Sequence, residues 1–190
     1  MRVETYIHGR PCPGETESGD AGCVHASGSV TWVLLVDALG HGPEAAKVGI
    51  EALDEVRSSF TQELSIDAAM KRLNTRLRGT RGAAATLLRF GSEQIEVTGI
   101  GNVELRTLDG DALPYVPGKG ILGRRMPRLR SFALKPEHGG RLLLFTDGIE
   151  RRVPLRDYAS RPAAQLAEGL VGEHALARDD AMVVVVDYSP

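Results

Sequence analysis

The sequence predicts an α+β domain in which strands and helices pack in layers. Segments typical of strands stand near both ends of the chain, joined to their neighbours by short turns, and a pair of amphipathic helices lies between them. Connections of this kind favour a layered α+β arrangement over a doubly wound parallel sheet. The length of 190 residues suits one domain with a sizeable core, which we expect to span residues 1–190.

The N-terminal part of the chain predicts three strands. Residues 2–7 alternate between apolar and polar side chains, as a half-buried strand does. Residues 21–27 and 30–38 predict two further strands joined through Gly28 and Ser29.

Two amphipathic helices are expected next. The first covers residues 43–60, where a proline near the start suits the first helical turn. Its expected buried side consists of Ala46, Ile50, Leu53 and Val56. The second helix covers residues 65–77 and ends near Gly79. Each helix should lie with its apolar side against a sheet.

The second half of the chain is rich in predicted strands. These strands cover residues 83–90, 94–101, 103–108, 129–134 and 140–148. A shorter helix is expected over residues 162–175. The chain closes on residues 181–188, a run of β-branched side chains typical of a central strand.

Composition limits the functional classes. Hydrophobic residues make up 42% and charged residues 25% of the chain, and the net charge of −2 points to neither nucleic acid nor an anionic membrane. No apolar run approaches the ~20 residues that span a bilayer, and no secretory leader is visible. The two cysteines, Cys12 and Cys23, are too few for a disulfide framework. We expect a cytoplasmic protein with reduced thiols.

One segment, residues 119–130, is strongly basic and contains no acidic residue. Its charged residues are Lys119, Arg124, Arg125, Arg128 and Arg130. A solvated loop is the simpler interpretation. The functional alternative is a docking surface for an acidic or phosphorylated partner.

Aspartates stand at the ends of several predicted strands. Asp20 begins one strand, Asp37 and Asp147 end two buried strands, and Asp179 and Asp180 precede the last strand. Each alone is explained as a turn or cap residue. Together, these strands could bring the carboxylates to one rim of a sheet, where like charges repel unless a cation is present. Oxygen ligands suit Mg²⁺ or Mn²⁺, and two such ions about 3.5–4 Å apart form a clamp for phosphoryl displacement.

The order of these motifs resembles the metal-dependent PP2C-type (PPM) serine/threonine phosphatases. The motifs are Asp20, "DALGHG" at 37–42, "GIGN" at 99–102, "TDG" at 146–148 and "DDAM" at 179–182. They are most similar to the bacterial SpoIIE, RsbU and RsbX branch, over roughly residues 18–186. The resemblance implies a four-layer αββα sandwich, with two mainly antiparallel central sheets flanked by helices.

The resemblance also implies the residues of the site. Asp37 would bridge two Mn²⁺ or Mg²⁺ ions, and the backbone carbonyl of Ala38 would serve the same site. Asp20, Asp147 and Asp179 would complete the metal ligands. Asp37, Asp147 and Asp179 are thereby the expected catalytic residues. In this mechanism a water bridging the ions attacks phosphorus directly, and no phosphoenzyme forms.

His41 is a further candidate catalytic residue. It stands four residues after Asp37, in a spacing like the bacterial "DxxGHG" pattern, and could act as a general acid. The alternative is that Gly40 and Gly42 give the backbone angles of a strand-to-helix turn, whose helix N-terminus could help to hold an anion. Arg10 is the nearest candidate for the phosphate-binding arginine of eukaryotic members.

The resemblance implies a phosphatase of the stand-alone RsbX type, because ~190 residues leave no room for a separate sensor region. Its substrates would be phosphoserine or phosphothreonine on stressosome proteins of the RsbS and RsbR kind, which it would reset in a bacterial stress response. Two alternatives stay open. One is a phosphatase acting on another antagonist protein of a partner-switching pathway. The other is a catalytically silent binding module, against which the retention of Asp37, Asp147 and Asp179 argues.

Overall fold

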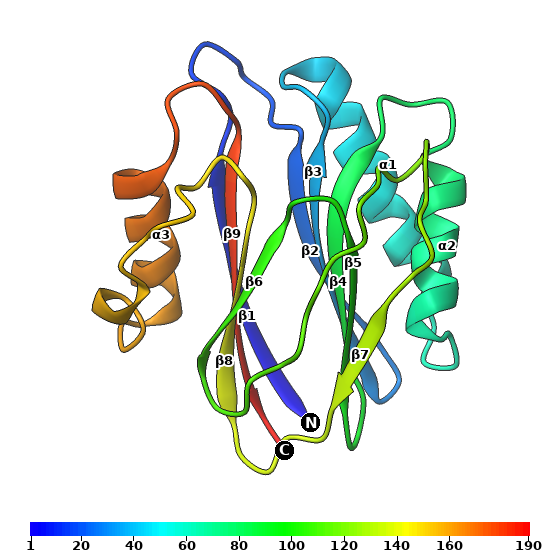
Figure 1. The fold of residues 1–190 in the computed structure, drawn as a ribbon, viewed down its shortest axis with the longest axis vertical. Helices are drawn as coiled ribbons and strands as arrows, with labels where there is room; N and C mark the ends of the chain where they lie inside the picture. The colour runs from blue at the N-terminus through cyan, green and yellow to red at the C-terminus, as the bar shows by residue number, and fades with distance from the viewer.

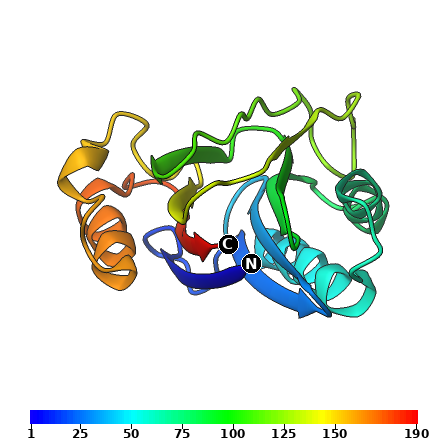
Figure 2. The same cartoon turned by 90° about the horizontal axis from the view of Figure 1, so that it is seen from below.

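The protein has two antiparallel sheets packed face to face, with helices on both outer sides. The computed structural model describes residues 1–190 (Figure 1). One sheet has the strand order β1-β9-β8-β6, and the other has the order β2-β3-β4-β5-β7. Seen from below, the layers follow one another as helix, sheet, sheet and helices (Figure 2). The predicted α+β fold, a four-layer αββα sandwich, is confirmed.

Every predicted helix and strand is present, with bounds that differ by at most three residues. The first sheet contains β1 (Arg2–Arg10), β6 (Glu104–Asp109), β8 (Gly140–Phe145) and β9 (Ala181–Ser189). The second contains β2 (Asp20–Ser27), β3 (Val30–Ala38), β4 (Ala83–Phe90), β5 (Ile95–Ile100) and β7 (Ser131–Leu134). The helices are α1 (Pro43–Ser59), α2 (Ile66–Arg76) and α3 (Ala163–His174). None of them combines the length and the apolar character that crossing a membrane requires.

The central strands bury both of their faces, which explains their unbroken apolar runs. In β3, Val33 and Leu35 pack towards the other sheet, whereas Leu34 and Val36 pack with α1 and α2. The valines of β9 divide in the same way between the inter-sheet core and α3. Because successive side chains of a strand point to opposite faces, a strand between two apolar layers needs apolar residues at every position.

The buried side of α1 differs from the predicted one. Ile50 is 56% exposed, and Leu53 is only partly buried. The residues that face the sheet are mostly small, namely Ala45, Ala46, Val48, Gly49, Ala52 and Val56. A Cβ atom at Gly49 would lie only 2.9 Å from the Cβ atom of Ala21 on β2. The close approach of α1 to β2 therefore selects small side chains and leaves Ile50 on the outer side of the helix.

Candidate metal centre

Two of the predicted ligands lie side by side at the end of the inter-sheet core. Asp20 on β2 and Asp37 on β3 are directly opposite each other in the strand register, so their side chains share one face of the sheet. Alternation along β3 gives Asp37 the same face as Val33 and Leu35, which pack towards the other sheet. Both carboxylates therefore face the gap between the two sheets.

The other sheet brings three more aspartates to the same end of the molecule. Asp147 follows the last residues of β8, and Asp179 and Asp180 precede β9, the antiparallel neighbour of β8. In Figure 1 this end of the sandwich is the one at which β3 leads into α1, opposite the two chain termini. The aspartates predicted to gather at one rim thus come from both sheets.

Burial and mutual repulsion raise the pKa values of Asp20, Asp37 and Asp179. Burial, with smaller contributions from the charges of Asp180 and Asp179, raises the pKa of Asp20 to about 8, although the hydrogen bond from Thr146 acts to lower it. Burial also raises the pKa of Asp37 to about 9, together with the charges of Asp20 and Asp147. The pKa of Asp179 is raised as well, first by burial and then by the charge of Asp147. Asp20, Asp37, Asp147 and Asp179 therefore form one electrostatic cluster, which we call the carboxylate cluster.

Two neutral side chains donate hydrogen bonds to the carboxylate cluster. The Thr146 hydroxyl donates to Oδ2 of Asp20 at 2.7 Å, and Nδ2 of Asn102 donates to Oδ2 of Asp147 at 2.5 Å. Neither residue was predicted as part of the site. The alternation of side chains along an extended chain does indicate a place for Thr146 in the site. Thr146 points to the same face as Leu144, which belongs to the inter-sheet core.

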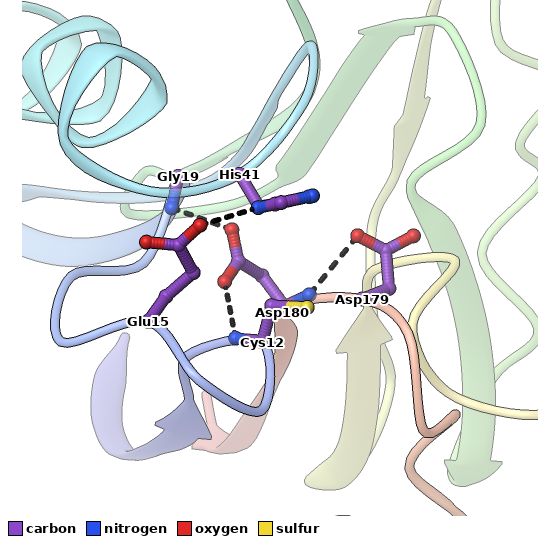
Figure 3. Close-up of polar contacts among 6 residues, drawn as sticks. All are labelled: Cys12, Glu15, Gly19, His41, Asp179 and Asp180. Atoms are coloured by element: carbon purple, nitrogen blue, oxygen red, sulfur yellow. Dashed lines mark hydrogen bonds and ion pairs between the residues drawn. The ribbon is translucent and has the colours of Figure 1, made fainter.

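Asp180 fixes the loop between β1 and β2 across the site (Figure 3). Its Oδ1 accepts a hydrogen bond from the backbone N–H of Cys12, and its Oδ2 accepts one from the backbone N–H of Gly19, both at 2.7 Å. Asp180 is only 3% exposed. Asp180 therefore acts as a structural anchor, a role that was not predicted for it from the sequence.

His41 lies at the rim of the site and contacts the same loop. Its Nδ1 is 2.9 Å from Oε1 of Glu15 (Figure 3). Gly40 and Gly42 have positive φ angles of 84° and 74°, so the prediction that glycines form this turn is confirmed. Glu15 was not predicted as a site residue, because no local motif links it to His41.

Arg10 is engaged with the backbone and is not free to bind a phosphate group. Its guanidinium donates to the carbonyl oxygen of Leu176 at 2.7 Å, to that of Pro11 at 2.9 Å and to that of Asp179 at 3.3 Å. Arg10 therefore ties the end of β1 to the segment that carries Asp179.

The donor set of the carboxylate cluster fits a hard divalent cation. None of its members forms an ion pair with lysine, arginine or histidine, although unpaired buried charge is costly. Carboxylate oxygens are the ligands that Mg²⁺ and Mn²⁺ prefer. No three acidic, histidine or cysteine side chains already converge on one ion-sized point, since Asp20 and Asp147 turn to Thr146 and Asn102. Ion binding would therefore require side-chain rotations.

Close packing explains the glycine that follows Asp147. A Cβ atom at Gly148 would lie 1.7 Å from the carbonyl oxygen of Asp180. We expect Gly148→Ala to push the end of β8 away from β9 and to lower the free energy of unfolding by about 3 kcal/mol, as overpacking does. Denaturant unfolding measures this loss. The matched control is Gly172→Ala in α3, where a Cβ atom meets nothing within 4 Å; equal stability of the two variants would contradict the prediction.

Comparison with known proteins agrees with the resemblance inferred from the motifs. The family model of stage II sporulation protein E (SpoIIE) matches residues 27–189. The phosphoserine phosphatase RsbX of Bacillus subtilis (strain 168) is 23% identical over 151 residues, which cover 77% of this chain and 75% of RsbX. A solved structure of RsbX in complex with magnesium has a TM-score of 0.82 at 21% identity, over 98% of this chain and 96% of that chain.

Further solved structures share the fold. One of them comes from work on the bacterial stressosome as a modular system that has been adapted to control secondary messenger signaling. It has a TM-score of 0.89 at 29% identity, and the match covers 98% of this chain and 100% of that chain. The PP2C domain of SiaA from Pseudomonas aeruginosa has a TM-score of 0.72 at 18% identity, over 97% of this chain and 86% of that one. The fold is therefore that of the PP2C phosphatases. Because the SpoIIE model matches most of its length, the chain belongs to the SpoIIE family.

Proposed function

We propose that the protein is a metal-dependent phosphatase that hydrolyses phosphoserine and phosphothreonine in protein substrates, and that residues 1–190 form a single catalytic domain. The observation that carries the proposal is the carboxylate cluster, in which aspartates from both sheets gather at one end of the molecule without cationic partners. Membership of the SpoIIE family supports it, as does similarity to a phosphoserine phosphatase, RsbX, that has been solved with magnesium.

The cluster residues would hold two Mg²⁺ or Mn²⁺ ions. Asp37 would bridge them, the carbonyl of Ala38 would lie alongside, and the other three aspartates of the cluster would complete the ligands. Bound ions supply the charge that neutralises phosphoryl oxygens and acidifies a water for direct attack on phosphorus. The protein's own contribution is rigidity, because Asp37 ends a strand that is buried on both faces.

His41 would act on the leaving group. An ionised carboxylate only accepts hydrogen bonds, so Glu15 holds the N–H at Nδ1 of the imidazole. In protonated His41 this leaves the N–H at Nε2 free to protonate the departing serine or threonine oxygen. Figure 3 shows the ring extending from Glu15 towards the side on which Asp179 lies.

The proposed substrates are stressosome proteins of the RsbS and RsbR kind, which the phosphatase would reset after a bacterial stress response. Two observations support this choice. The chain is 29% identical over 98% of its length to a chain from work on the bacterial stressosome. It is also similar in sequence over 77% of its length to RsbX.

Chelation of divalent ions tests the reaction. We expect hydrolysis of p-nitrophenyl phosphate in the presence of Mn²⁺, and a fall of at least about 100-fold with EDTA, because the ions contribute several kcal/mol to such reactions. Excess Mn²⁺ or Mg²⁺ should restore the rate. Activity that EDTA leaves unchanged would contradict the metal mechanism. Release of phosphate from phosphorylated RsbS- and RsbR-like proteins tests the substrate, and tight binding of these proteins without hydrolysis by an otherwise inactive chain would favour a silent module.

A further inference from the structure

Exposed basic side chains without ion-pair partners gather beside the metal centre. The segment between β6 and β7 contributes Lys119, Arg124, Arg125, Arg128 and Arg130, and α2 with the turn that follows it contributes Lys71, Arg78 and Arg81. All are exposed, and none forms an ion pair. We call these residues the basic surface.

The two parts of the basic surface are joined because the segment packs on α2. The backbone N–H of Gly123 donates to Oδ1 of Asn74 at 3.0 Å. Lys71 and Asn74 are three residues apart in α2, so they lie on the same side of the helix, and Arg78 follows in the turn at its end. Lys71 and Arg128 also line one surface hollow, together with the acidic Asp67. The basic charges of α2 and of the segment therefore belong to one continuous face.

Backbone hydrogen bonds connect this face to the carboxylate cluster. Leu122 and Ala83 exchange backbone hydrogen bonds of 3.2 and 2.8 Å, and Ala83 is paired with Ala38, the residue after the proposed bridging aspartate. At the N-terminal end of the segment, Gly118 forms backbone hydrogen bonds with Gly99 and Gly101. Gly101 directly precedes Asn102, which contacts the carboxylate cluster. Figure 1 shows the segment rising between the two sheets and crossing to the α2 side before it enters β7.

Arg81 extends the basic surface to the rim of the site. Its Nη1 lies 2.8 Å from the position that a Cβ atom of Gly40 would take. Gly40 belongs to the turn that carries His41. A ligand bound on the basic surface would therefore lie next to the residues proposed to act on the phosphoryl group.

The composition of this face favours a protein partner over a nucleic acid. Half-buried Met126, Pro127 and Leu129 and exposed Val116 stand among the arginines, and arginine with methionine is typical of protein interfaces. Residues 116–130 contain no aromatic side chain on which bases could stack. The whole chain has a net charge of only −2, so the positive charge is local and fits a locally acidic partner.

We propose that the basic surface docks acidic side chains that flank the phosphorylated residue of the substrate. The substrate class is therefore a phosphoprotein whose phosphosite lies beside an acidic segment. This inference rests on the proposed phosphatase function. Docking contacts of this kind are made equally in the ground state and the transition state, so they lower KM and leave kcat unchanged.

The test compares two synthetic phosphoserine peptides, one flanked by aspartate and glutamate and the other by asparagine and glutamine. The altered protein carries Arg124→Gln, Arg125→Gln and Arg128→Gln. The matched control carries Arg57→Gln, Arg152→Gln and Arg156→Gln, which remove three exposed arginines elsewhere. We expect the first variant to lower kcat/KM for the acidic peptide about tenfold, or about 1.4 kcal/mol.

This loss should lie in KM and should shrink at high salt. Hydrolysis of the neutral peptide and of p-nitrophenyl phosphate should stay unchanged, as should all activities of the control variant. Fluorescence anisotropy of the labelled acidic peptide measures docking independently of activity and should show the same difference between the two variants.

Several outcomes would overturn the proposal. One is equal use of both peptides by the unaltered protein, and another is equal binding of the acidic peptide by both variants. Tighter binding of a single-stranded oligonucleotide than of the acidic peptide at physiological salt would assign the surface to nucleic acid instead. Failure of the unaltered protein to hydrolyse p-nitrophenyl phosphate, with peptide docking intact, would contradict the phosphatase function alone.

Discussion

Replacement of Asp37 by asparagine is expected to lower the metal-dependent phosphatase rate by at least about 1,000-fold, because the proposed bridging charge is worth several kcal/mol to the reaction. The same variant should be more stable than the original protein in the absence of metal. Burial and the charges of Asp20 and Asp147 raise the pKa of Asp37 to about 9, so at neutral pH the carboxyl must take up a proton on folding, and a neutral amide of similar shape avoids this cost. A gain of about 1 kcal/mol would raise the unfolding midpoint by roughly 2–4 °C.

The measurements are kcat on p-nitrophenyl phosphate with Mn²⁺ and the unfolding midpoint with EDTA. Asp109→Asn is the matched control, because Asp109 is exposed at the end of β6, away from the carboxylate cluster. It should change neither quantity. If Asp37→Asn kept a tenth or more of the activity, Asp37 would not be the bridging ligand. If it lowered the stability of the metal-free protein, the repulsion inferred within the cluster would be wrong.

The opposite behaviour of activity and stability is what separates a functional carboxylate from a structural one. Asp180 shows the contrast, because both of its oxygens accept backbone hydrogen bonds. Its burial is compensated within the protein, whereas the burial of Asp20 and Asp37 is compensated by no cationic side chain. Buried carboxyl groups without such compensation are a feature of functional sites, which supports the proposed metal site.

Strand positions were predictable from the sequence because the signal is local. The apolar segments 30–38 and 181–188 differ from the polar turns around them. The motifs "DALGHG" and "TDG" begin or lie where apolar segments end, which identified Asp37 and Asp147 as residues at strand ends. Sheet order and the facing direction of each side chain depend on pairing between distant strands. An unbroken apolar run such as that of β3 cannot show which face meets the other sheet, since both faces are buried.

The errors and omissions have the same origin. Helical periodicity placed Ile50 on the buried side of α1, but the actual contact side follows from how closely α1 approaches β2. Glu15 and His41 are 26 positions apart, with β2 and β3 between them, and Glu15 lies in the irregular loop between β1 and β2. Such contacts leave no periodic signal, and only the folded backbone brings the two side chains together.

In the absence of divalent ions, the protein is expected to lose stability as the pH rises from about 5 to about 9. The folded chain holds protons on Asp37 with a pKa of about 9 and on Asp20 with a pKa of about 8, whereas an unfolded aspartate has a pKa of about 3.9. Between these values the unfolded chain has released protons that the folded chain retains. Raising the pH therefore favours unfolding, and the stability present below about pH 4 is lost as the pH passes through 8 and 9.

Magnesium should flatten this dependence, because a bound cation replaces the protons that neutralise the cluster. At a concentration of about 100 times its Kd, the ion adds about 2.7 kcal/mol to the free energy of unfolding, and the gain should grow with pH as protons compete less. Unfolding midpoints between pH 5 and 9, with EDTA and with Mg²⁺, measure both effects, and metal-free Asp37→Asn should show a shallower slope than the original protein. A metal-free midpoint that rises with pH, or identical slopes with and without Mg²⁺, would mean that the carboxylate cluster does not bind a divalent ion in place of its protons.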